Sequence, residues 1–184
     1  MKKAWIAVLA LVVLLIIPII GSYNSLVNMN EDVNGKWAQV DVQLQRRADL
    51  IPNLVATVKG YAEQEKEIMN NLADARSRLM GAQTVADKAA ANEELTSALS
   101  RLLVIVENYP NLKSDANFRQ LQDELAGTEN RLAVARKDYN DSVQVYNAKI
   151  KSFPTNMMAG MFGFSARDYF QVEEGAKTVP QVKF

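Results

Sequence analysis

The sequence predicts an all-α protein: an elongated, antiparallel, up-and-down helical bundle preceded by an N-terminal transmembrane helix. Apolar and aromatic residues recur at alternating steps of four and three from Val33 to Leu79, with only Arg47 and Glu65 as exceptions. This period of about 3.5 residues is typical of a helix face that is buried against other helices. An uncharged apolar run occupies residues 4–20, and glycine and proline are scarce, with 8 and 5 residues in 184. These observations favour long helices, and neither strands nor loops fit the periodic stretch.

The composition excludes several classes of chemistry. The chain contains no cysteine and no histidine, which excludes disulfides, thiolate or imidazole metal ligands, and Cys or His nucleophiles and bases. Glutamate clusters alone do not make a ferritin-like metal site, which needs Glu-x-x-His pairs. The formal net charge is zero and no basic stripe is present, so we expect no nucleic-acid partner. We therefore expect no metal, no cofactor and no catalytic residues.

Residues 1–21 are predicted to form a transmembrane anchor that contacts the lipid bilayer through residues 4–20. At about 1.5 Å per residue this run spans roughly 25 Å, near the short limit for a membrane helix. No Ala-x-Ala-like cleavage site follows the run, which favours a retained anchor over a cleaved signal peptide. Lys2 and Lys3 precede it, so the positive-inside rule favours a cytoplasmic N-terminus and an extracytoplasmic bundle. Residues 22–36 are predicted to continue as a helical stalk.

Residues 37–153 are predicted to form a long-helix bundle. Its first helix is expected to run unbroken to Leu79, and it contains Pro52. Because the apolar seam keeps its phase across Pro52, we expect a kink there rather than a restart with Asp49 as N-cap. Gly81 is expected to end this helix, since glycine tolerates the left-handed conformation that is common at helix ends.

The second helix of the bundle is expected over about residues 85–108. Thr84 suits its N-cap, and Thr84 with Asp87 forms a start similar to a capping box. The run 103–105 (Leu-Val-Ile) widens the apolar surface beyond the seam. We therefore expect this helix to be the most buried of the bundle.

The third helix of the bundle is expected over about residues 115–152. Ser114 suits its N-cap. Phe153-Pro154 ends it, because the residue before a proline is pushed out of the helical region. Residues 154–184 are predicted to form a Met/Phe-rich loop and a C-terminal tail that packs on the bundle.

Several long phrases of the chain resemble one family. The phrases VDVQLQRRADLIPNLVATVKGYA and ENYPNLKSDANFRQLQDELAGTENRLAVARKDYNDSVQVYN, and the ending FP…GF…YF, are similar to the LemA family of bacterial membrane proteins. The resemblance implies an inner-membrane-anchored bundle of four helices with no established enzymatic activity and no catalytic residues. Family members often have membrane proteases encoded beside them, which hints at a role in envelope maintenance.

An arginine on the apolar seam is the first candidate site. Arg46 and Arg47 adjoin Asp49, and Arg47 falls on the seam itself. A buried arginine must be paired, because an unpaired buried charge costs about 3–5 kcal/mol. We favour an internal ion pair with Glu129 or Glu124 that fixes the register of the helices, over a docking site for an acidic partner group.

A second polar group follows on the last long helix. Tyrosine precedes asparagine twice, seven residues apart, and the cluster is expected to form a structural hydrogen-bond network, since buried polar groups are usually satisfied. Its members are Glu129, Asn130, Arg131, Tyr139, Asn140, Tyr146 and Asn147.

The third candidate is a patch of methionine and phenylalanine. Methionine-rich surfaces adapt to varied partners, so the patch suits a partner protein, a neighbouring subunit or lipid. A cap over the open end of the bundle explains it equally well. Its members are Met157, Met158, Met161, Phe162 and Phe164.

These expectations combine into a function that involves no catalysis. The chain is expected to be a single-pass protein of the bacterial inner membrane that acts as a scaffold or oligomerising interaction module of the envelope, with homo-oligomers and other envelope proteins as partners. The alternative is an adaptor or regulator of a membrane protease. A carboxylate enzyme is a third class, and it would require a bound metal.

Overall fold

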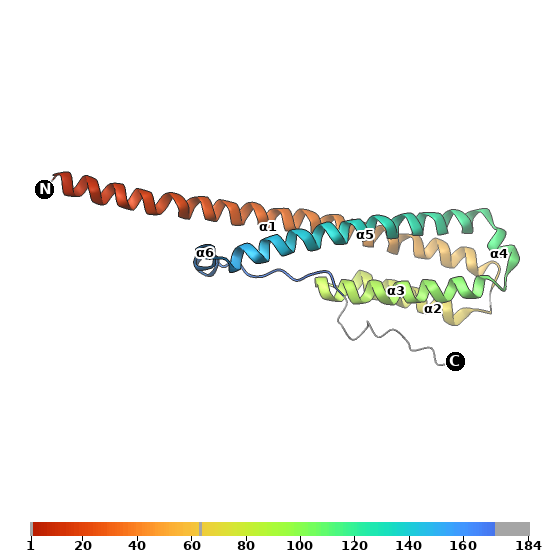
Figure 1. The fold of residues 1–184 in the computed structure, drawn as a ribbon. Helices are drawn as coiled ribbons and strands as arrows, with labels where there is room; N and C mark the ends of the chain where they lie inside the picture. The colour runs from red at the N-terminus through yellow and green to blue at the C-terminus, as the bar shows by residue number, and fades with distance from the viewer. Residues whose placement is uncertain (1, 63, 172–184) are drawn as a thin grey trace, which may run out of the picture. The chain divides into compact units, whose positions relative to one another are not determined.

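The fold was analysed in a computed structural model, which describes residues 2–62 and 64–171; of these, the side chains of residues 2–4 and 6–16 are not described. Within these ranges the protein is all-α, as predicted, and contains no strand (Figure 1). The helices are α1 (Lys2–Lys59), α2 (Lys66–Gly81), α3 (Val85–Val106), α4 (Pro110–Ser114), α5 (Ala116–Lys151) and α6 (Thr155–Phe162).

The described residues divide into two compact units. Unit 1 contains the chain up to Trp37 together with Asp138–Asp168, and unit 2 contains Ala38–Lys137 together with the chain from Tyr169 onward. Two helices, α1 and α5, contribute residues to both units.

Unit 2 is a helical bundle. Polar contacts show that α1 and α5 run in opposite directions, because later residues of α1 meet earlier residues of α5. The contacts between α1 and α3 advance together along both helices, so these two helices run in the same direction. Helices α2 and α3 lie side by side (Figure 1). The contacts are Gln43–Arg131 and Arg47–Glu129 for α1 and α5, and Asp41–Lys88 and Arg47–Asn92 for α1 and α3.

The apolar seam is buried, but it belongs to two helices instead of one. The expected unbroken helix to Leu79 is wrong, because α1 ends at Lys59 and α2 begins at Lys66. Gly60, which follows the last residue of α1, disfavours helix by about 1 kcal/mol relative to alanine. Tyr61, a seam position at the break, is 45% exposed. The buried seam residues are Val33, Val40, Leu44, Arg47, Ile51, Leu54, Val58, Leu72, Ala75 and Leu79.

Helix α1 continues through Pro52, so the alternative of a restart at Asp49 is wrong. A proline has no N–H, which leaves the carbonyl four residues earlier, at Ala48, without its helical donor. Arg76 of α2 donates its Nε–H to the Ala48 oxygen at 2.9 Å. A side chain from the neighbouring helix therefore satisfies the carbonyl that Pro52 releases.

The helix starts were predicted in part. The hydroxyl oxygen of Thr84 accepts from Asp87 N at 3.0 Å, so the predicted cap of α3 is confirmed. The prediction of Ser114 as the cap of the third helix of the bundle is wrong, because Ser114 is the last residue of α4. Asp115 caps α5 instead, and its Oδ1 accepts from Phe118 N at 2.9 Å.

The apolar surface of α3 is less buried than expected. Its seam residues Leu95 and Leu102 are fully buried, but Leu103 and Val104 are 44% and 71% exposed. The predicted burial of the run 103–105 is therefore wrong for Leu103 and Val104. A helix buries the stripe that faces its neighbours, and residues 103 and 104 fall outside that stripe.

The predicted anchor lies mostly outside the described side chains. The backbone of residues 4–20 is part of α1. Within the part of the chain that the structure describes, no helix carries a stretch both long enough and apolar enough to cross a membrane. Residues 22–36 of the predicted stalk are helical, and Leu26 and Val33 are buried.

The segment after α5 differs from the predicted loop. Residues Thr155–Phe162 form helix α6, which ends at Gly163 with φ 76°, a left-handed conformation that glycine adopts without strain. Phe170 is buried in unit 2, where the Arg136 guanidinium lies 4.8 Å from the ring centroid. Residues 172–184 of the predicted tail lie outside the described residues.

Candidate functional site

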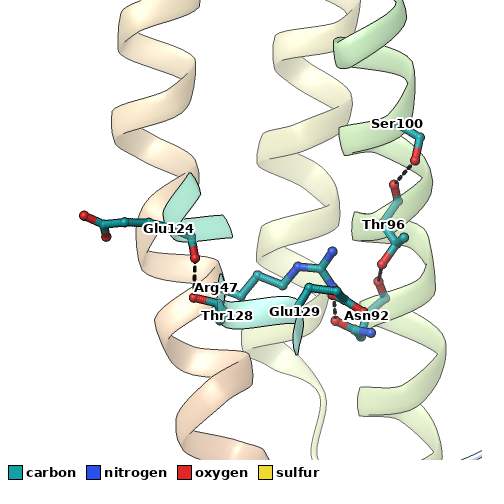
Figure 2. Close-up of polar contacts among 7 residues, drawn as sticks. All are labelled: Arg47, Asn92, Thr96, Ser100, Glu124, Thr128 and Glu129. Atoms are coloured by element: carbon teal, nitrogen blue, oxygen red, sulfur yellow. Dashed lines mark hydrogen bonds and ion pairs between the residues drawn. The ribbon is translucent and has the colours of Figure 1, made fainter. Parts of the chain in front are cut away.

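The Arg47 cluster, which consists of Arg47, Asn92 and Glu129, is the most buried charged group in the described part of unit 2. Arg47 extends from α1 toward α3 and α5, and it is 4% exposed (Figure 2). Its Nη1 donates to Asn92 Oδ1 at 2.7 Å and forms an ion pair with Glu129 Oε2 at 2.7 Å. One guanidinium group therefore links three helices of the bundle.

Burial controls the electrostatics of this cluster. It lowers the pKa of the Arg47 guanidinium below its ordinary range, the Glu129 carboxylate opposes this by raising the pKa, and Arg136 lowers it further. Among the described residues, the buried Arg47 Nε has no hydrogen-bond partner, and Glu129 Oε2 meets Arg47 Nη1 as an ion pair without the geometry of a hydrogen bond. The cluster is therefore an ion pair whose hydrogen-bonding capacity is only partly used.

A cavity of about 410 Å³ adjoins the ion pair. Its walls are mainly leucine side chains of α1, α3 and α5, with hydroxyl and amide groups at the edges. Two of these groups are already engaged, because the Thr96 and Ser100 hydroxyls donate to the carbonyls of Asn92 and Thr96 at 2.8 and 2.9 Å (Figure 2). The cavity thus combines apolar walls with the Arg47–Glu129 ion pair and the Asp123 carboxylate.

Other members of the predicted arginine site lie on the surface. Arg46 and Asp49 are exposed, and Asp49 accepts from Gln45 Nε2 at 2.9 Å. Glu124, the other carboxylate considered for Arg47, accepts a weak bond from Gln120 at 3.4 Å instead. The structure therefore brings Arg47 together with Glu129.

The neighbours of Glu129 on α5 have separate environments. Asn130 is exposed. The Arg131 guanidinium donates to Thr128 Oγ1 at 3.3 Å and to Gln43 Oε1 at 3.4 Å. These long bonds tie Arg131 to the outer part of the contact between α1 and α5.

The predicted tyrosine–asparagine network belongs to unit 1, where it holds the segment after α6. The Tyr139 hydroxyl donates to the Asp168 carbonyl at 2.7 Å. The Asn147 amide makes two bonds to one residue, because Nδ2 donates to the Arg167 carbonyl and Oδ1 accepts from the Arg167 N–H, each at 2.9 Å. We call this pair of bonds the Asn147 clasp.

The two tyrosines of the network lie on the buried face of α5. Tyr139 and Tyr146 are 2% and 1% exposed, and burial is the main cause that raises the pKa of each phenol. The ring of Tyr139 lies 5.3 Å from that of Trp37, centroid to centroid. Asn140, the other predicted asparagine, is half-buried.

The Met/Phe patch divides into a buried and an exposed part. Met158 is buried, Phe164 is half-buried, and Met157, Met161 and Phe162 are 64%, 74% and 48% exposed. Phe162 and Phe164 both contact the ring of Tyr23, with centroid distances of 4.9 and 5.9 Å. We call the exposed group of Phe153, Met157, Met161 and Phe162 the α6 surface.

Two residues that matter in these sites, Asn92 and Arg167, were not singled out from the sequence. Asn92 could have been found, because it continues the α3 seam of Leu95, Leu99 and Leu102 backward by one step of three. The partner of Asn147 is the backbone of Arg167 in an irregular segment, where no periodicity marks it. Among the described residues, no group of three acidic side chains is placed to hold a metal ion.

A family model and a set of related proteins show which known proteins this chain is similar to. A model of the LemA family matches residues 36–184. The magnetosome protein MamQ 2 of Paramagnetospirillum magneticum is 30% identical over 193 aligned positions, which cover 91% of this chain and 71% of the relative. MamQ of Magnetospirillum gryphiswaldense is 29% identical, with coverage of 96% and 75%, and protein LemA of Metamycoplasma hominis is 23% identical, with coverage of 84% and 71%. The chain belongs to the LemA family.

Proposed function

We propose that the protein is a non-enzymatic, single-pass membrane protein whose helical bundle acts as a scaffold or oligomerising interaction module of the bacterial envelope. The observation that carries this proposal is the continuity of α1 from Lys2 to Lys59. The same helix contains the apolar run of residues 4–20 and the seam that packs against α3 and α5. An anchor and a bundle that share one helix suit a protein that holds partners at a membrane.

The run itself supports anchoring. Its 17 residues (4–20) carry no charge, and at about 1.5 Å per residue they span roughly 25 Å, which suffices for a thin or locally compressed bilayer. Lys2 and Lys3 then favour a cytoplasmic N-terminus and an extracytoplasmic bundle.

The interior of the bundle supports a structural role. The shared direction of α1 and α3, the opposite direction of α5 and the position of α2 beside α3 suit a four-helix, up-and-down bundle, the architecture expected of the family. The buried Arg47 side chain joins helices through Asn92 and Glu129, and the chain has neither cysteine nor histidine. A scaffold needs a defined interior of this kind and no reactive group.

Alkaline extraction of membranes tests the anchor. The full chain is expected to stay in the membrane pellet in carbonate at pH 11. The double variant Leu11→Arg and Leu14→Arg should move to the supernatant, because each central arginine costs about 2.5–3.5 kcal/mol on insertion. Leu103→Arg, at an exposed position of α3, is the matched control and should stay in the pellet. Extraction of the unmodified chain would end the proposal.

Cross-linking in native membranes tests the scaffold. Amine-reactive cross-linkers are expected to give species at multiples of the chain mass together with envelope proteins. If a membrane protease were the main cross-linked species, the adaptor alternative would replace the scaffold. Monomer alone would contradict both.

A phosphatase fused after Phe184 should be active outside the membrane, and activity of a cytoplasmic reporter at that position would reverse the orientation.

A further inference from the structure

We propose that α6 is a membrane-interface helix, whose exposed α6 surface inserts into the headgroup and upper acyl region of the bilayer that holds the anchor. This inference rests on the proposed membrane anchoring of residues 4–20. It assigns lipid as the occupant of a surface for which a partner protein or a second subunit was also considered. It also assigns a second point of contact with the membrane, about 140 residues after the first along the chain.

The chemistry of the α6 surface suits an apolar phase. The side chains of Phe153, Met157, Met161 and Phe162 are between 48% and 81% exposed. Met157 and Met161 are four residues apart and thus share one face of α6. The opposite face is already used, because Thr155, Met158 and Ala159 are buried. Phe153 precedes α6, and Phe162 lies at the edge of the buried side, four residues after Met158, so the exposed face is formed by Met157 and Met161. Bulky apolar side chains that are exposed together in this way mark a surface that a second phase or partner covers.

The charge pattern separates lipid from a soluble partner. Residues 153–166 contain no charged side chain, whereas Lys149 and Lys151 lie in the last turn of α5 immediately before them. A soluble-protein interface places a polar rim around its apolar centre. An uncharged apolar face with cations at one end matches acyl chains beneath anionic headgroups.

The contacts of Tyr23 place α6 at the level where the anchor ends. Tyr23 follows Ile20, the last residue of the apolar run, by three residues, or about 4.5 Å along the helix axis. Its ring contacts Phe162 and Phe164 edge-on. Ile17, Ile19 and Ile20 expose apolar side chains on the same stretch of α1. Aromatic rings are favoured at the membrane–water interface, so the three rings and the α6 surface occupy one depth.

The left-handed residue after α6 supports this placement. Gly163, with φ 76°, reverses the chain so that Phe164 N donates to the Ala159 carbonyl at 2.9 Å. This turn brings Phe164 back to Tyr23 while it leaves Met157 and Met161 exposed. The C-terminal end of α6 is therefore held against Tyr23 by aromatic contacts, while the side chains of Met157 and Met161 stay exposed.

Fluorescence quenching by brominated lipids tests the proposal on the full chain in phosphatidylcholine vesicles with phosphatidylglycerol. Trp5 and Trp37 are the two native tryptophans, so each variant carries one reporter. Trp37→Phe alone keeps Trp5 and reports the anchor. Adding Trp5→Phe and Met161→Trp reports the α6 surface. The matched control replaces Met161→Trp with Asn156→Trp, an exposed position about 140° away around the helix.

We expect quenching at position 161 by lipids brominated near the headgroup to be at least about twofold stronger than at position 156, since only the methionine face meets acyl chains. Met157→Trp, one turn earlier, should match position 161 and serves as the reporter if the first variant does not fold. If Trp5 is quenched while positions 157 and 161 are not, the membrane contact of α6 is refuted and the anchor stands. If none of them is quenched, the anchor fails as well.

Discussion

The Arg47 cluster and the Asn147 clasp hold the described chain by different physical means. In unit 2, a guanidinium that is almost fully buried bridges a carboxylate and an amide on two other helices. In unit 1, a neutral amide forms two bonds with the backbone of a single residue. The first contact joins side chains, each of which another residue could replace. The second satisfies backbone groups that every residue at position 167 would present.

The two contacts therefore differ in which substitution costs the most stability. A buried ion pair gains little net stability, because desolvation offsets most of the attraction, but losing one partner leaves a charge in the interior. A neutral amide–backbone contact has a smaller desolvation cost, and losing it strands one donor and one acceptor. The cluster therefore depends on both partners being present, and the clasp depends on the asparagine alone.

Removing the carboxylate of the cluster should give the largest effect. Glu129→Ala leaves the Arg47 charge buried with only Asn92, and we expect a loss of about 2–3 kcal/mol in the free energy of unfolding. This lies below the usual range for a buried pair, because the Glu129 side chain is 41% exposed. Urea denaturation monitored by circular dichroism measures it.

The double variant Arg47→Met with Glu129→Ala sharpens the same test. Methionine removes the buried charge and keeps most of the side-chain volume, but it leaves the buried Asn92 oxygen without its donor. The double variant should therefore regain part of the stability that Glu129→Ala loses, with the stranded oxygen accounting for about 1 kcal/mol of the remaining difference. If it were as unstable as Glu129→Ala alone, then the loss would come from packing and not from an unpaired charge.

Removing the clasp should give the next largest effect. Asn147→Ala strands the N–H and the carbonyl of Arg167, and we expect a loss of about 1–2 kcal/mol for a buried donor and acceptor left without partners. Hydrogen exchange should accelerate most at the Arg167 amide. Asn130→Ala, at an exposed position of the same helix, is the control and should change neither quantity. An unchanged exchange rate at Arg167 would contradict the clasp.

Much of the fold follows from periodicity, because a helix buries the side chains that recur on one face. Val40, Leu44, Ile51 and Leu54 are buried where the period predicts. The periodicity does not predict the break after Lys59, because Tyr61 and Ile68 continue the spacing of the apolar seam across it. Two helices that each need an apolar face can keep a common phase by chance, and only Gly60 signalled the turn.

The candidate sites follow from the sequence only where they lie on helices. A single charged residue on an apolar seam requires a partner, and this requirement led to Arg47 and Glu129. The Asn147 clasp pairs a helix with an irregular segment, so no spacing in the sequence connects Asn147 with Arg167. The sequence predicts a loop where α6 lies, because one glycine inside the helix, a second directly after it and a length of eight residues give little periodic signal.

The contact between Arg76 and Ala48 combines a charged side-chain donor, as in the Arg47 cluster, with a backbone acceptor, as in the Asn147 clasp, since a guanidinium donates to a backbone carbonyl. Arg76→Ala should cost about 1 kcal/mol, less than a fully buried charged bond, because Arg76 is only half-buried. In a Pro52→Ala background, residue 52 regains an N–H that can reach the Ala48 carbonyl. We therefore expect Arg76→Ala to cost clearly less there, as a double-mutant cycle would measure. Equal costs in both backgrounds would refute the compensation.

The smallest effect is expected from a charge that is exposed and caps a helix. The Phe118 N–H, and after it the Tyr61 hydroxyl, lower the pKa of the Asp115 carboxyl below its ordinary value. A lowered pKa in the folded state means that the unfolded chain binds the proton more tightly. The stabilisation is then complete above the unfolded pKa of about 3.9 and is lost as the pH falls through the folded pKa.

Asp115→Asn keeps an oxygen that can cap α5 but removes the charge. The unmodified protein should therefore exceed Asp115→Asn in stability at pH 6, and this advantage should shrink as the pH is lowered to 3, as urea midpoints at the two values would show. Tyr61→Phe removes only the second donor, so it should preserve part of the pH dependence, because the Phe118 N–H is the larger cause. If the advantage over Asp115→Asn were the same at both pH values, the cap would act through its geometry alone and not through the charge of the Asp115 carboxylate.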